Sequence, residues 1–127
     1  VLPLLESDLL TVMQATTNGT LEETEVKFSD KNACCVIMAS EGYPVKYEKG
    51  YEMTIPEEIS GNVYVAGAEL KDGKLLTNGG RVLGVTAVEN DLKSAVKASY
   101  NLVDKISFGN AFYRHDIGAK ALAAVKE

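Results

Sequence analysis

Residues 75–88 constrain the fold more than any other part of the sequence. Two apolar runs flank the turn Asn78-Gly79-Gly80, and Arg81 is the first residue of the second run. Paired glycines adopt backbone conformations that other residues resist, and they let another backbone or a ligand approach closely. A guanidinium that follows such a turn is suited to bind a phosphate or a carboxylate through two parallel hydrogen bonds. An ordinary β-turn with an exposed arginine is the alternative, and these residues alone favour neither.

Length and charge limit the possible classes of function. A chain of 127 residues is long enough for one domain with a hydrophobic core, but not for a large multidomain enzyme. Its formal charge of −5 argues against nucleic acid or an anionic membrane as a partner. We expect no membrane span and no signal peptide, because no apolar run is long enough and the start lacks a basic leader. Because the sequence opens at Val1 and not at methionine, we expect a piece of a longer protein.

Two adjacent cysteines, Cys34 and Cys35, lie in a predicted strand, so their side chains point to opposite faces of the sheet. Neighbours of this kind form a poor disulfide, and neither has a partner at the spacing of a zinc site. We therefore expect buried thiols in a reducing compartment and a cytoplasmic protein.

The hydrophobic pattern predicts an α+β fold with an antiparallel core of about six strands and flanking helices. Residues 33–39 and 81–88 are apolar on both faces, which is typical of strands covered on both sides. Asp72-Gly73 indicates a type I′ hairpin. The helices are expected at 4–17, at 90–106 after a cap at Asn90 or Asp91, and in the Ala-rich segment at the end. The remaining expected elements are strands at 25–28, 51–55, 63–70 and 74–77, a loop at 40–50 and a turn at 56–60.

The residues of conventional catalysis are scarce in this sequence. The single histidine, His115, has no serine or cysteine in a nucleophile motif, and no Walker loop or G-x-G-x-x-G motif is present. The carboxylates form no pair that could be assigned to one substrate. We therefore expect no catalytic residue and no metal site in this chain, and no activity of the chain by itself.

Three segments combine glycine with a cation and could together form a wall that binds an anion. They are the loop 40–50 with Lys46 and Lys49, the turn before Arg81, and 113–118 with Arg114. The alternative for the two lysines is a solvated surface. For Arg114 it is a structural ion pair with Asp116.

Four blocks of sequence together resemble the C-terminal part of the phosphoribosylamine–glycine ligase family. They are CCVIMAS at 34–40 followed by EGYP, YEKG at 47–50, TNGGRVLGVTA at 77–87 and YRHDIGAKAL at 113–122. The segment 2–9 also resembles the last helix of that family's ATP-grasp domain. The resemblance therefore implies that residues 1–20 belong to a missing ATP-grasp domain and that residues 21–127 form the β-rich C-terminal domain.

The resemblance also implies a function and a fold. Family members join glycine to 5-phosphoribosylamine through glycyl phosphate in de novo purine biosynthesis, using ATP and Mg²⁺. The nucleotide and metal sites would precede Val1, in the missing N-terminal and ATP-grasp domains, so we expect no cofactor within this chain. The C-terminal domain would have a barrel-sandwich-hybrid-like core, a rudiment single hybrid motif, and would help to close the active site.

The expected substrate-binding residues come from this combination of chemistry and resemblance. We expect Arg81, supported by Asn78, Gly79 and Gly80, to contact an anionic group of a substrate or intermediate. A second set follows the predicted central strand, where ligand-binding loops often lie, and comprises Ser40, Gly42 and Tyr43. Two alternatives remain: a carrier domain modified on Lys71 or Lys74, and a purely structural domain that supports the ATP-grasp domain.

Overall fold

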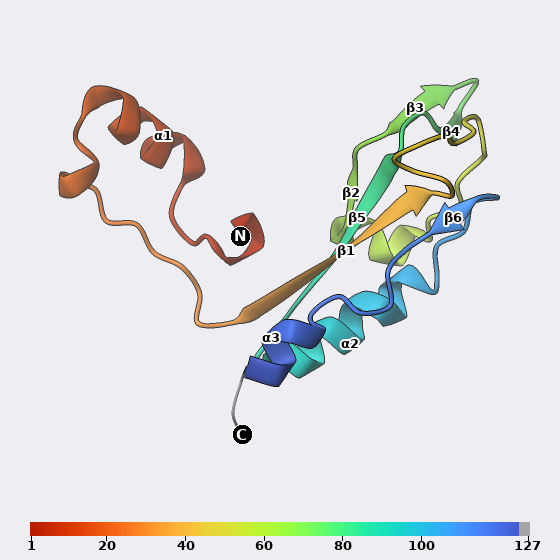
Figure 1. The fold of residues 1–127 in the computed structure, drawn as a ribbon. Helices are drawn as coiled ribbons and strands as arrows, with labels where there is room; N and C mark the ends of the chain where they lie inside the picture. The colour runs from red at the N-terminus through yellow and green to blue at the C-terminus, as the bar shows by residue number, and fades with distance from the viewer. Residues whose placement is uncertain (125–127) are drawn as a thin grey trace.

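A four-stranded antiparallel sheet forms the centre of the computed structural model, which describes residues 1–124 (Figure 1). The strands lie in the order β2-β5-β1-β6. Their bounds are β1 Asn32–Ser40, β2 Val63–Val65, β5 Arg81–Glu89 and β6 Ala111–Phe112. The predicted α+β class with antiparallel strands is confirmed, and no closed barrel forms within residues 1–124.

The two long strands β1 and β5 differ in burial. Val82 to Ala87 are buried without a break in β5, as the sequence predicts. In β1, Cys34 is buried whereas Cys35 and Ile37 are exposed, so the expectation of buried thiols is correct for Cys34 and wrong for Cys35. The prediction that β1 is covered on both faces is therefore wrong, because one helical layer packs on the sheet and leaves much of the other face open. The prediction that the two cysteines face opposite sides is correct, and burial raises the pKa of the Cys34 thiol.

Helix α2, Leu92–Val103, covers the buried face of the sheet (Figure 1). Asp91 caps it by accepting a 2.8 Å hydrogen bond from the backbone N–H of Ser94. Ser99 joins the helix to both long strands: its hydroxyl donates to Cys34 O at 2.7 Å and accepts from Ala87 N at 3.1 Å. The helix ends three residues before the predicted end at 106.

The predicted hairpin forms between β3, Ala68–Lys71, and β4, Lys74–Thr77. Asp72 and Gly73 connect them with positive φ angles of 51° and 77°, as a type I′ turn requires. The strand predicted at 63–70 is divided in two, because the chain leaves β5 after Gly67 and turns into the hairpin. Residues 51–55 form isolated bridges at Glu52 and Thr54 in place of the predicted strand.

The first 30 residues form an arm on the side of the sheet opposite α2 (Figure 1). Helix α1, Leu9–Asn18, begins after the capping residue Asp8, not at Leu4 as predicted, and it ends at Gly19 with a φ of 72°. The predicted strand 25–28 is a single bridge between Leu5 and Phe28.

Short 3₁₀ helices occur at Leu2–Leu4, Leu21–Glu23 and Glu57–Asn62, the last in place of the predicted turn. The C-terminal helix α3 covers Ala119–Ala124, and the predicted continuation to 127 lies outside the described residues.

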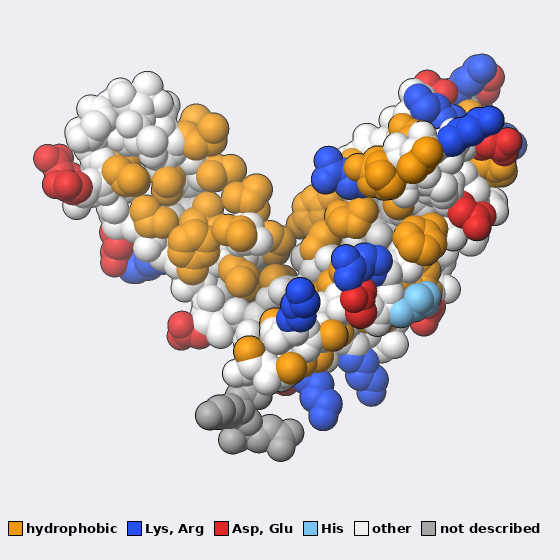
Figure 2. Space-filling model, in the orientation of Figure 1, with side chains coloured by type: hydrophobic (Ala, Val, Ile, Leu, Met, Phe, Trp, Pro, Cys, Tyr) orange, Lys and Arg blue, Asp and Glu red, His pale blue; other side chains and the backbone are white. Residues whose placement is uncertain are grey.

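Hydrophobic side chains gather on the facing sides of the arm and the sheet (Figure 2). The exposed apolar residues include Leu10 and Met13 of α1, Ile37 of β1 and Tyr64 of β2. None of the helices described is long and apolar enough to span a membrane.

Candidate functional site

The turn before β5 places Arg81 at the start of the strand, opposite Ala39 of β1. The register of β1 and β5 shifts at this point, between Met38 and Ala39. Arg81 is exposed, and within residues 1–124 its guanidinium takes part in none of the ion pairs. An arginine whose backbone is held in place, and whose guanidinium has no ion-pair partner, remains available to an anionic ligand.

Ser40 and Gly67 hold this turn from its two sides. The backbone N–H of Ser40 donates to Gly80 O at 2.8 Å, and the Ser40 hydroxyl donates to Gly79 O at 3.0 Å. Gly67 donates to Arg81 O at 2.9 Å and accepts from Asn78 N at 2.8 Å. Ser40 is fully buried, so its contacts are with the turn and not with solvent.

Tyr43 covers the turn from the loop 40–50. A Cβ on Gly80 would lie 2.0 Å from Cδ2 of the Tyr43 ring, so the close packing depends on glycine. The ring of Tyr43 meets that of Tyr47 edge to face, with the centroids 6.0 Å apart. Gly42 is required for a different reason: its φ is 89°, and a Cβ would lie 2.0 Å from Lys46 O.

A cavity of about 390 Å³ lies between Tyr43 and Arg81. Its lining is mostly apolar, and Arg81 is the charged residue among those that line it. The lining residues are Ile37, Tyr43, Ala66, Gly80, Arg81, Leu83 and Gly84. The sequence prediction named three of these residues, Tyr43, Gly80 and Arg81, and missed the apolar ones, because it expected Ile37 to lie in a strand covered on both faces.

The loop 40–50 separates this cavity from a second one of about 310 Å³. Gly42 and Lys46 line the second cavity together with Glu41 and Glu48. The hydroxyl of Tyr51 donates to Glu48 Oε2 at 2.6 Å, and this hydrogen bond raises the pKa of Tyr51. Two carboxylates make this cavity poorly suited to an anion, and Lys46 does not join Arg81 in one site.

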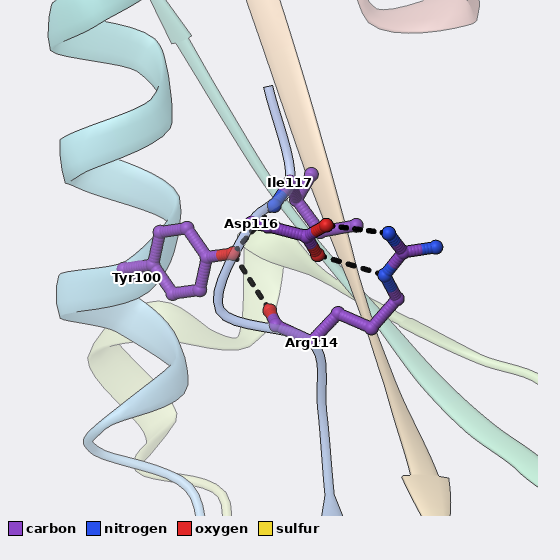
Figure 3. Close-up of polar contacts among 4 residues, drawn as sticks. All are labelled: Tyr100, Arg114, Asp116 and Ile117. Carbon is purple, nitrogen blue, oxygen red and sulfur yellow. Dashed lines mark hydrogen bonds and ion pairs between the residues drawn. The ribbon is translucent and has the colours of Figure 1, made fainter. Parts of the chain in front are cut away.

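Arg114 forms the structural ion pair that was the alternative to anion binding (Figure 3). Its Nε donates to Asp116 Oδ1 at 2.8 Å, and its Nη2 donates to Asp116 Oδ2. These hydrogen bonds lower the pKa of Asp116. The hydroxyl of Tyr100 donates to Arg114 O and accepts from Ile117 N, which ties the segment to α2. The segment 113–118 contributes no residue to the Arg81 cavity, so the predicted three-part wall does not form.

The remaining candidates for chemistry stay apart from this site. His115 is exposed, and its ring lies 4.8 Å from that of Tyr113. Within residues 1–124 no three histidine, cysteine, aspartate or glutamate side chains are grouped so that they could hold a metal ion. Asn78 is hydrogen-bonded to Glu69 Oε2 through its side-chain amide at 3.0 Å.

Comparison with known proteins supplies the family. A family model described as "Phosphoribosylglycinamide synthetase, C domain" matches residues 33–120. The chain belongs to this family. It is 45% identical over 120 residues to a phosphoribosylamine–glycine ligase of Caldanaerobacter subterraneus, covering 94% of this chain and 29% of that relative.

Two further proteins are similar to this chain and have related names. The chicken trifunctional purine biosynthetic protein adenosine-3 is 46% identical over 131 residues, covering 100% of this chain and 13% of that protein. The crystal structure of a phosphoribosylamine–glycine ligase from Thermotoga maritima matches with a TM-score of 0.69 and 37% identity, over 82% of this chain and 27% of that one. This C-domain chain therefore spans less than a third of the length of these relatives.

The C-domain match begins inside β1 and ends inside α3, so it contains the turn, Arg81 and both cavities. The arm formed by the first 30 residues lies before the match. The resemblance noted in the sequence is confirmed, and the carrier alternative at Lys71 and Lys74 finds no support.

Proposed function

We propose that this chain is the C-terminal part of an ATP-dependent ligase that joins glycine to 5-phosphoribosylamine in purine biosynthesis. Support comes from the family membership, the names of the relatives and the share of their length that the chain covers. ATP and Mg²⁺ would be bound by the remainder of the ligase, as the resemblance to the family implies. We place the enzyme in the cytoplasm, by analogy with soluble biosynthetic enzymes.

Within this ligase, Arg81 contacts an anionic group of a substrate or of the glycyl phosphate intermediate. Two observations carry the assignment. Arg81 has no ion-pair partner within residues 1–124. It follows a hydrogen-bonded turn and lines a cavity. Asn78, Gly79 and Gly80 shape the turn, and Gly42 and Tyr43 belong to the loop that covers it. Phosphoryl chemistry needs fixed cations where charge accumulates, and this arginine supplies one.

The rest of the ligase is the partner of the open apolar surfaces. The arm has an exposed helix, and backbone hydrogen bonds join residues 4–6 to 27–29. We assign residues 1–20 to the end of the ATP-grasp domain and residues 21–127 to the C-terminal domain. The antiparallel sheet and its hairpin are consistent with a rudimentary barrel-sandwich-hybrid core, which would help to close the active site.

Substitution of Arg81 in the full-length ligase tests the proposal. Arg81→Ala should lower kcat/KM by about 10- to 100-fold, since a charge-assisted hydrogen bond contributes roughly 1.5–3 kcal/mol. Arg81→Lys should recover part of this loss, because lysine keeps the charge but not the two-pronged geometry.

Arg114→Ala serves as the matched control, because it removes the other arginine, which is held in an ion pair. If Arg81→Ala leaves kcat/KM unchanged for both glycine and phosphoribosylamine, the domain has a purely supporting role.

A further inference from the structure

Ser40 stands out because it is fully buried and polar, and it directs its hydrogen bonds at the turn before Arg81. Its N–H donates to Gly80 O at 2.8 Å and its hydroxyl donates to Gly79 O at 3.0 Å. We propose that Ser40 is a positioning residue that holds Arg81 in the orientation that binds the anionic substrate. This inference rests on the function proposed above for Arg81.

The backbone at Arg81 departs from regular strand geometry, so its side-chain direction depends on local contacts. Met38 pairs with Leu83 but Ala39 pairs with Arg81, which leaves Val82 as an extra residue in β5. A bulge of this kind bends the strand and redirects the neighbouring side chains. Ser40 follows the bulge directly in β1.

The hydrogen bonds that fix the turn come from both sides, but they differ in kind. On one side, Gly67 contributes only backbone groups, bonded to Arg81 and Asn78. On the other side, Ser40 contributes a backbone N–H and a hydroxyl. Ser40→Ala therefore removes one of the constraints and leaves the turn in place, held less firmly.

Direct contact between Ser40 and a ligand is not compatible with its burial. Its side chain has no exposed surface, whereas Arg81 is exposed and lines the cavity together with Tyr43. Ser40 can act on a ligand only through the turn that carries Arg81.

The test uses steady-state kinetics of the full-length ligase. Ser40→Ala should raise the KM for the substrate whose KM rises in Arg81→Ala by about five- to tenfold, the size of one lost hydrogen-bond constraint. The KM for the other substrate should change less than twofold.

Ser99→Ala is the matched control, because Ser99 is also fully buried and makes two hydrogen bonds, but through α2 and away from the turn. A merely structural role would lower the thermal midpoint and the active fraction in both variants and leave both KM values unchanged. That result for Ser40→Ala would overturn the inference.

A double-mutant cycle with Arg81 tests whether Ser40 acts through it. If it does, Ser40→Ala has no further effect on KM in the Arg81→Ala background. An equal effect of Ser40→Ala in both backgrounds would mean that Ser40 acts independently, and the inference would be wrong.

Hydrogen exchange separates this inference from the proposed function. In the full-length ligase, Ser40→Ala should accelerate exchange in a peptide covering residues 76–84 by at least fivefold, whereas Ser99→Ala should not. An unchanged rate shows that Ser40 does not hold the turn, whatever Arg81 does. If Arg81→Ala leaves the kinetics unchanged, the proposed substrate contact fails, and this exchange rate alone then decides whether Ser40 fixes the turn.

Discussion

Gly67 lies backbone to backbone against Gly79, a residue of the turn that carries Arg81. A Cβ on Gly79 would lie 2.8 Å from the Cα of Gly67, and a Cβ on Gly67 would lie 2.5 Å from Arg81 O. Both contacts involve backbone atoms, which cannot move aside as a flexible side chain can. The close approach of the two segments therefore requires glycine at both positions.

Gly67→Ala should destabilise the chain by about 1–3 kcal/mol through overpacking. Urea unfolding measures this change as a lower midpoint. Gly61→Ala is the matched control, because a Cβ there would meet no atom within 4 Å. Equal midpoints for the two variants would show that the segments separate without cost.

Gly80→Ala should have a different outcome, because the obstacle is the ring of Tyr43. Tyr43 is 42% exposed, so its ring has room to swing away. We expect a smaller loss of stability than for Gly67→Ala, and a double-mutant cycle with Tyr43→Ala should show a coupling of about 0.5–2 kcal/mol. Additive effects of the two substitutions would contradict the packing of Tyr43 on the turn.

The cap of α2 should contribute stability that depends on pH. The backbone N–H of Ser94, and then its hydroxyl, bond to the Asp91 carboxylate and lower its pKa. Because the pKa is lower in the folded chain, the contribution is full above the ordinary pKa of the carboxyl and is lost as pH falls through the lowered value.

Asp91→Ala should therefore lower the thermal midpoint at pH 7, and its difference from the parent chain should shrink below about pH 4. Asp91→Asn keeps a capping oxygen and serves as the control without this titration. A midpoint difference for Asp91→Ala that stays constant from pH 7 to pH 3 would exclude the carboxylate as its source.

Tyr100 should matter more for stability than the nearby ion pair. Tyr100→Phe removes a hydroxyl that donates to Arg114 O and accepts from Ile117 N, at a cost of about 1–2 kcal/mol. Asp116→Asn breaks a pair whose side chains are 67% and 60% exposed, so solvent screening should leave the unfolding midpoint nearly unchanged. A larger loss for Asp116→Asn than for Tyr100→Phe would reverse this order.

Turn residues, apolar runs and helix caps in the sequence predicted the elements that depend on interactions between residues close together in the chain. The Asp72-Gly73 pair predicted the hairpin because positive φ at both positions selects a type I′ turn. The apolar runs predicted β1 and β5, and Asp91 predicted the start of α2. The elements that failed, such as the strands at 25–28 and 51–55, depend on partners that are distant in sequence and form only single bridges.

The sequence by itself determined the family, the class of fold and the turn with a single arginine after it, because these follow from residue identity and spacing. Only the tertiary structure decided that Arg114 is held in an ion pair while Arg81 is not, and that Ser40 is buried beneath the turn. These assignments depend on which segments meet in space. Two arginines beside glycine look alike in a sequence, and their difference arises from the neighbours that folding brings to each.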